Sequence, residues 1–313
     1  MSSAPAIVWP AGMQVFERGW LSSNTVVLAG TLNAVVDTGY VSHAALGLEL
    51  VRRALGDAPL HRIVNTHLHS DHCGGNAVLQ QAYPQARTHI PAPDAEIAMR
   101  WDAARLSFAA TGQRCDRFRV DRAFTEGDEL MLGDLTFIAR AAKGHDPRMF
   151  VLWCPDERLL FSADALWEDG FGVVFPELEG EPGFAEVRAT LDMIAGLGAT
   201  RVVPGHGAPF TEVDVALERA YGRLDYLAAD PQRNARHALK VLVKFLLLDL
   251  QRLPLADLTR RLHAMRYVRE IDARHLHQGE EALAVWVADA LVRAGAAALE
   301  DGVLVNQIGR AHV

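Results

Sequence analysis

The feature that most constrains this chain is a cluster of histidines and an aspartate after a short apolar stretch. Residues 63–65 read as the end of a β-strand, and His67, His69, Asp71 and His72 follow within a few positions. Side chains at i and i+2 of an extended strand point the same way, so His67 and His69 should project together. Neutral imidazole and carboxylate groups are the usual ligands of zinc, iron and manganese. The motif therefore predicts a metal site at the end of a strand.

Further candidate ligands stand just past the ends of other predicted strands. They are His145 after residues 135–139, Asp164 after residues 159–161, and His206 after residues 201–203. Loops at strand ends collect functional groups on a rigid scaffold. A single Gly-His pair is more often a turn, but this order and context favour ligands. Since one ion is satisfied by three or four protein ligands, the whole set indicates two metal ions.

This set of motifs resembles the metallo-β-lactamase superfamily. The shared pattern is His-x-His-x-Asp-His, then a Gly-His, then an Asp after a strand, then a Gly-His-Gly; residues 35–39, Val-Val-Asp-Thr-Gly, match a further signature. The resemblance covers roughly residues 13–230. The resemblance implies that one metal ion is held by His67, His69 and His145. It implies that a second ion is held by Asp71, His72 and His206, and that Asp164 bridges the two ions.

Asp37, in the early signature, is not a metal ligand in that superfamily. We expect it either to orient a ligand through a hydrogen bond or to serve as a structural turn residue. Cys73 adjoins the first motif. It is a candidate ligand, but a packed thiol is the favoured interpretation.

The hydrophobic pattern predicts an α/β fold, an αββα sandwich of two mixed β-sheets flanked by helices, over residues 1–230. Short strands are expected over residues 14–16, 25–28 and 34–36, and a helix over residues 43–55. A long helix over residues 93–110 is expected to cover the first sheet.

A composition shift at Asp230 and Pro231 predicts a domain boundary, with a small, mostly helical domain over residues 231–313. Three helices are followed by a hairpin that turns at Asp301 and Gly302, an order similar to a winged helix. Winged helices often bind nucleic acid, but the arginines of this region are interspersed with acids. We therefore favour a lid over the active site or a homodimer contact and keep RNA binding as an alternative.

The ligand types predict hydrolysis. Two divalent ions about 3.5–4 Å apart can share a water and lower its pKa toward about 7, so that a metal-bridging hydroxide is available at neutral pH. Asp71 is the group we expect to steer that hydroxide and to accept its proton. The loop after Asp164 carries Trp167, Phe171 and Phe175. These aromatic side chains are expected either to wall a substrate pocket or to pack in the core.

The composition of the chain bears on its expected partners and cellular compartment. The net charge of −8 gives no global basic field that would recruit nucleic acid. There is no long apolar run typical of a membrane span, and residues 1–5 do not read as a secretory signal. Three widely spaced cysteines, an odd number, favour reduced thiols. A cytoplasmic protein that does not contact membranes is therefore expected.

We predict a binuclear metal-dependent hydrolase, with zinc ahead of iron or manganese, that acts on a small ester-like substrate. A thioester or lactone is favoured over a phosphodiester. His72 and Asp164 disfavour a true β-lactamase. A glyoxalase II-like thioesterase is a competing hypothesis, although the thiol-binding Asn-Pro-Phe-Leu-Arg segment of that family is not seen near the C-terminus. Two more are an endoribonuclease or phosphodiesterase that grips RNA through residues 231–313 and a non-catalytic metal sensor.

Overall fold

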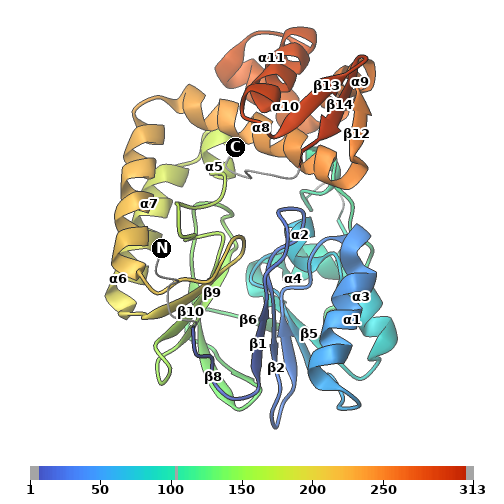
Figure 1. Cartoon of the computed structure of the whole chain (residues 1–313). Coiled ribbons are helices and arrows are strands. Elements are labelled where there is room, and N and C mark those ends of the chain that lie inside the picture. Colours follow the sequence, from blue (N-terminus) through green and yellow to red (C-terminus); the bar gives the residue numbers. More distant parts are fainter. Residues whose placement is uncertain (1–6, 103–104, 308–313) are drawn as a thin grey trace, which may run out of the picture.

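Two mixed β-sheets pack face to face in the lower part of the molecule (Figure 1). The computed structural model describes residues 7–102 and 105–307. The first sheet has the order β1-β2-β3-β4-β5-β6: β1 (Met13–Phe16), β2 (Thr25–Leu28), β3 (Ala34–Val36), β4 (Arg62–Val64), β5 (Arg87–Pro91) and β6 (Arg122–Phe124). The second has the order β11-β10-β9-β8-β7: β7 (Glu129–Leu132), β8 (Leu135–Ala141), β9 (Phe150–Cys154), β10 (Leu159–Ala163) and β11 (Arg201–Pro204).

Several of the strands that precede the loops with candidate ligands are paired in parallel. In the first sheet β3, β4, β5 and β6 are parallel, whereas β1, β2 and β3 pair antiparallel. In the second sheet β10 and β11 are parallel and the remaining pairs are antiparallel. Because the carboxyl ends of parallel strands meet at one edge, loops after β3, β4, β10 and β11 can approach one another.

The two faces of each strand enter different cores. Val26 and Val36 pack between the sheets against Phe137, whereas their neighbours Val27 and Val35 pack outward. Successive strand side chains point to opposite faces, and here both faces are apolar because both are covered.

Helices complete the outer layers. α1 (Ala44–Leu55) and α3 (Asn76–Ala82) cover the first sheet, and α6 (Gly183–Leu197) and α7 (Val213–Ala228) cover the second. Figure 1 shows these pairs on opposite sides of the sandwich. The predicted αββα arrangement of mixed sheets is confirmed.

The long helix predicted over residues 93–110 is wrong. α4 (Ala92–Arg100) ends where Trp101 adopts a left-handed backbone with φ 55°. Trp101 then packs against Phe108 and Phe118, with ring centroids 5.9 and 5.5 Å apart. Residues 103–104, within the predicted helix, lie outside the described residues. The aromatic contacts bury these side chains without continuing the helix.

The C-terminal region lies across the top of the sandwich (Figure 1). Its helical elements are α8 (Pro231–Leu250), α9 (Leu255–Ala264), α10 (Arg266–Ile271), a π-helical turn (Asp272–Leu276) and α11 (Glu280–Arg293). The predicted hairpin is present as β13 (Ala297–Glu300) and β14 (Val303–Asn306). An unpredicted strand, β12 (Arg252–Pro254), pairs with β14. The domain boundary at residue 230 and the winged-helix-like interpretation stay predictions.

The core of this region includes two residues from the sandwich half. Val173 and Leu178 pack among the buried side chains of α8, α9 and α11. Leu178 belongs to α5 (Phe175–Glu179). The segment after β10 is therefore held between the two parts of the molecule. Within residues 7–102 and 105–307, no helix is both long enough and apolar enough to cross a bilayer.

Candidate metal centre

The seven predicted ligands converge at the carboxyl ends of the strands. They fall into two groups in which the potential ligand atoms lie within 4.8 Å of one another: His67, His69, His145 and Asp164 in the first, and Asp71, His72 and His206 in the second. The loops that carry them follow β4, β8, β10 and β11, and Asp71 and His72 lie in the short helix α2 (Ser70–Cys73). Each group has the number and kind of ligands that suit one divalent ion.

Buried nitrogens without partners show that these side chains fit a metal. The His67 and His72 rings are 0% exposed, and their Nε2 atoms have no hydrogen-bond partner. An unpaired polar atom in such a position costs free energy. His145 Nε2 also lies only 2.8 Å from His69 Nδ1. A cation between these nitrogens would satisfy their lone pairs.

The other ring nitrogens are fixed by hydrogen bonds that turn the free nitrogen toward the centre. His72 Nδ1 lies 2.7 Å from Asp37 Oδ2, and His145 Nδ1 donates to the Val173 carbonyl at 2.7 Å. Such contacts set the tautomer of a ligating histidine and hold its ring in place.

Asp37 acts on both ligand groups. Besides contacting His72, its carboxylate accepts bonds from the backbone N–H and the hydroxyl of Thr66, at 2.9 and 2.8 Å. The same hydroxyl lies 3.1 Å from His67 Nδ1. Asp37 follows β3 in a left-handed conformation with φ 52°, which aspartate tolerates better than most residues. The geometry is that of a residue that orients ligands rather than of a simple turn aspartate.

Asp164 lies between the two groups. Its Oδ2 is 3.3 Å from His145 Nε2, whereas its Oδ1 is 3.5 Å from His72 Nε2. One oxygen therefore faces each group, as a bridging ligand requires. Gly205 makes this position possible, because a Cβ there would lie 2.2 Å from Asp164 Oδ1. The glycine before His206 is thus required for close approach.

Burial keeps the imidazoles of His67 and His145 neutral and suited to metal binding. Desolvation, assisted by His69, lowers the pKa of His145 to about 4. Desolvation and the neighbouring His72 hold the pKa of His67 well below its usual value. Burial alone would raise the pKa of Asp164, but His72 and His206 reverse this and lower it well below its usual range. His67 and His145 therefore offer neutral imidazoles beside an ionised carboxylate, whereas Asp164 and Asp37 outweigh burial and raise the pKa of His72 well above its usual value.

A cavity of about 540 Å³ opens above the metal centre. Its floor includes His69, Asp71, His145, Asp164 and His206. Its walls and roof come from distant parts of the chain, mainly aromatic or cationic side chains that sequence reasoning missed: Trp20, Arg223, His237, Lys244, Phe245 and Tyr267. No motif marks these residues, because only the fold brings them together.

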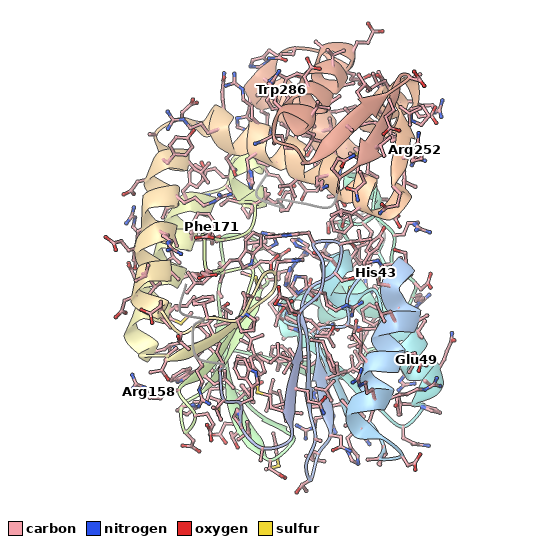
Figure 2. The ribbon with its side chains drawn as sticks, viewed as in Figure 1. His43, Glu49, Arg158, Phe171, Arg252 and Trp286 are labelled. Carbon is pink, nitrogen blue, oxygen red and sulfur yellow. The ribbon has the colours of Figure 1, made fainter. Side chains whose placement is uncertain are left out.

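The aromatic loop divides between pocket and core. Trp167 and Phe175 line the cavity, and the Trp167 indole N–H donates to Asp164 Oδ1 at 3.3 Å. Phe171 is 2% exposed and packs in the core under α6 and α7. Figure 2 labels Phe171 on the α7 side of the molecule. Of the two interpretations offered for this loop, core packing therefore describes Phe171, because the core offers its ring apolar neighbours.

Two further residues near the centre were not predicted. Asp146 directly follows His145, and its Oδ2 lies 3.4 Å from His69 Nε2, leaving His69 Nδ1 to face the centre. Its position next to His145 places it near the centre, but nothing in the sequence shows that its side chain reaches His69. Asn24 donates to the carbonyls of Pro204 and Gly207, at 3.0 and 2.7 Å, and so holds the loop of His206. Nothing in the sequence around Asn24 indicates this role.

Cys73 lies outside both ligand groups. It is fully buried, and its Sγ is 3.8 Å from Cys115 Sγ. Both are free thiols. These contacts agree with the favoured packed-thiol interpretation.

A group of polar contacts around Asp249 helps to fasten the C-terminal region to the sandwich half. Asp249, at the end of α8, accepts from Arg114 Nη2 at 3.0 and 3.1 Å and from the Tyr40 hydroxyl at 3.4 Å. Tyr40 in turn meets Phe245 edge to face, with ring centroids 5.1 Å apart. The cavity roof is therefore anchored beside the early loops of the first sheet.

Comparison with known proteins gives the same fold. The beta-lactamase-like protein 2 homolog of Caenorhabditis elegans is 28% identical over 225 residues, 70% of this chain and 65% of that protein. Hydroxyacylglutathione hydrolase of Rhodobacter capsulatus is 33% identical over 171 residues, 53% of this chain and 56% of that protein. The matches thus span less than two thirds of the length of these relatives.

A solved structure of a beta-lactamase domain protein from Burkholderia ambifaria is 20% identical and has a TM-score of 0.57. It covers 94% of this chain and 91% of its own, including the C-terminal region. The family model for the metallo-beta-lactamase superfamily matches residues 18–206, more than half of the chain. The predicted membership is confirmed: this protein belongs to the metallo-beta-lactamase superfamily.

Proposed function

We propose that this protein is a binuclear metal-dependent hydrolase of a small ester-like substrate, with a thioester ahead of a lactone. The observation that carries the proposal is the convergence of seven ligand side chains at the floor of a walled cavity. Superfamily membership supports the same reaction class.

In this proposal one ion would be held by His67, His69 and His145 and the other by Asp71, His72 and His206, and Asp164, which faces both groups, would contribute to both sites. Zinc is favoured, with iron or manganese compatible with the same ligands. When bound, two such ions supply Lewis acidity and a water whose pKa is lowered toward about 7.

The protein's own groups would orient the substrate and move the proton. Asp71 faces the cavity, and its Oδ2 lies 3.0 Å from His206 Nε2. Held in this way, its carboxylate is placed to accept a proton at the cavity floor. Trp20 stacks on His206, with ring centroids 5.4 Å apart, and so covers one face of that ring.

The size and walls of the cavity favour a small substrate. Its volume of about 540 Å³ is within the usual range for small-molecule sites. Trp167, Phe175 and Tyr267 give it apolar surfaces suited to an acyl chain. A polynucleotide needs an open basic groove instead. Similarity to proteins named hydroxyacylglutathione hydrolase supports a thioester in particular.

A substrate panel with measured metal content tests the proposal. Thioesters, lactones, lactams and phosphodiesters would be offered to protein loaded with zinc, iron or manganese, with the bound metal counted by mass spectrometry. We expect about two ions per chain and turnover of at least one thioester or lactone that stops on chelation and returns with metal. Turnover restricted to phosphodiesters, or failure to bind metal, would contradict it.

A further inference from the structure

A guanidinium in the cavity wall has no acidic partner. Arg223 extends from α7 and lines the cavity that contains the metal centre. Within the described chain, no ion pair joins Arg223 to an aspartate or glutamate, and its Nε is buried without a hydrogen-bond partner. A buried cation is normally paired. Its position suggests a partner that arrives with the substrate.

The surrounding residues hold the Arg223 side chain in one position through close contacts. Its guanidinium carbon lies 5.7 Å from the centroid of the Phe171 ring, a cation–π contact. Gly170, at φ 123°, leaves room for its stem, because a Cβ there would lie 2.7 Å from Arg223 Cδ. Phe171 and Gly170 follow the bridging Asp164 by only a few residues. The loop that continues from the metal centre therefore also positions Arg223.

A histidine of α8 also contacts the Arg223 side chain. Arg223 Nη2 donates to His237 Nε2 at 2.8 Å. An arginine has no acceptor, so His237 Nε2 must be unprotonated and the ring neutral. His237 therefore fixes the direction of the guanidinium without neutralising it. The positive charge remains available on the cavity side.

Other cations near the cavity are already engaged. Lys244 donates to the carbonyl of Ala296, the side chain of Asn306 and the carbonyl of Gln307, at 2.7, 2.6 and 3.2 Å. Arg219, one turn before Arg223 on α7, pairs with Asp169 at 2.9 Å. Arg223 is distinguished from both because it lacks an anionic or multiple-acceptor environment.

We propose that Arg223, held by His237, Phe171 and Gly170, binds a carboxylate on the substrate at a position remote from the bond that is cleaved. The inference rests on the proposed function and names its substrate class: an acyl compound with a free carboxylate. A guanidinium recognises a carboxylate through paired N–H donors. One unpaired positive charge suits a single negative charge, and the carboxylates of Glu168 and Asp169 on the same cavity wall disfavour a polyanion.

The electrostatic cost of the free side chain agrees with this role. Burial lowers the pKa of Arg223 from its ordinary value, with no acidic neighbour to restore it. A bound carboxylate would offset that desolvation. The same charge on an exposed arginine would gain much less from an anion.

Binding of a dicarboxylate and its neutral analogue tests the proposal independently of hydrolysis. Glutarate and glutaramide, which have the same chain length, would be titrated by calorimetry into metal-loaded wild-type protein and into Arg223→Gln, Arg223→Lys and Arg236→Gln. Arg236 is the matched control, because it is exposed on α8 and its side chain bonds only Gln232, at 3.1 Å. Metal-bound carboxylate would be unaffected by these substitutions.

We expect wild-type protein to prefer glutarate, and Arg223→Gln to bind it about 10- to 100-fold more weakly, the usual loss of a charged hydrogen bond. Arg236→Gln should keep the preference, and Arg223→Lys should keep part of it, which also covers the case in which Arg223→Gln does not fold. Equal binding of the two compounds by wild-type protein, or a preference for glutarate that is undiminished in Arg223→Gln, would overturn the proposal.

A substrate pair then links the subsite to the reaction. Thioesters of one thiol would carry either a terminal carboxylate or a terminal carboxamide on the acyl chain. The wild-type ratio of kcat/KM should favour the carboxylate, and that ratio should fall toward unity in Arg223→Gln but not in Arg236→Gln. If no thioester or lactone is cleaved while glutarate binding still depends on Arg223, the proposed function fails and the anion subsite stands.

Discussion

The floor and the roof of the cavity are built on different principles. We use floor for the seven candidate ligands (His67, His69, Asp71, His72, His145, Asp164 and His206), and roof for the cavity-lining residues of α8 (His237, Val241, Leu242, Lys244, Phe245 and Leu248). Floor side chains are oriented by hydrogen bonds, such as those from Asp37 and to the Val173 carbonyl. The roof is held mainly by apolar burial against α9 and α11. Hydrogen bonds thus orient the candidate ligands, whereas apolar packing determines the shape of the cavity above them.

The largest effect should come from a floor residue. Asp71→Ala removes the carboxylate expected to handle the proton, so turnover should fall by about 100- to 10,000-fold. The fold should survive, because Asp71 lies in the short helix α2 and outside the apolar cores. Activity assays beside circular dichroism and a metal count check this. Near-normal turnover would contradict the role assigned to Asp71.

Replacing a residue that orients the candidate ligands without being one of them should lower the affinity of the site for metal. Asp37→Asn weakens the contact with His72 Nδ1, so affinity for metal should fall by about 10- to 100-fold. Competition with a chelator measures this. Asp134→Asn, at an exposed carboxylate that accepts from the Thr31 backbone, is the control and should leave affinity unchanged. Equal metal affinity in Asp37→Asn and wild-type protein would show that Asp37 is only a structural residue.

Two phenylalanines that are close in sequence are expected to have different roles, one in core packing and one in contact with the substrate. Phe171→Ala should lower the free energy of unfolding by about 3–5 kcal/mol, because its ring is buried in the core. Phe175→Ala should affect stability less and instead raise KM, because this ring lines the cavity beside His69 and His145. Urea unfolding and steady-state kinetics of both variants measure the contrast. A smaller loss of unfolding free energy in Phe171→Ala than in Phe175→Ala would reverse our assignment.

The smallest effect should come from the contact that fastens the roof. Asp249→Ala removes the acceptor of Arg114 and of the Tyr40 hydroxyl, yet Arg114 is largely exposed. We expect a loss of about 1 kcal/mol in unfolding free energy. Thermal denaturation measures it, with Arg114→Gln as a partner variant. If the two losses add in the double variant, the pair does not interact.

The floor could be predicted from the sequence because its chemistry is local. His67, His69, Asp71 and His72 lie in one segment, and the remaining ligands each follow a strand whose apolar pattern is clear. The sheets and most helices follow from the same patterns. Asp146 was missed although it neighbours His145, because nothing in the sequence shows that it reaches His69.

The roof could not be predicted because it depends on contacts between distant segments. Arg223 and His237 lie on different helices, and neither belongs to a recognisable motif. The direction of Phe171 depends on the core that α6 and α7 offer it. The strand β12 is only three residues long and exists through pairing with β14. In each case tertiary packing, not local propensity, decides the outcome.

The cavity-lining residues of α8 follow a helical spacing. His237, Val241, Lys244 and Leu248 are separated by three or four positions, so they form one stripe along the helix. That stripe belongs to a contiguous stretch of chain that contains none of the candidate ligands. The side chains of this stripe can therefore be exchanged, and the shape of the cavity changed, without replacing any of the candidate metal ligands.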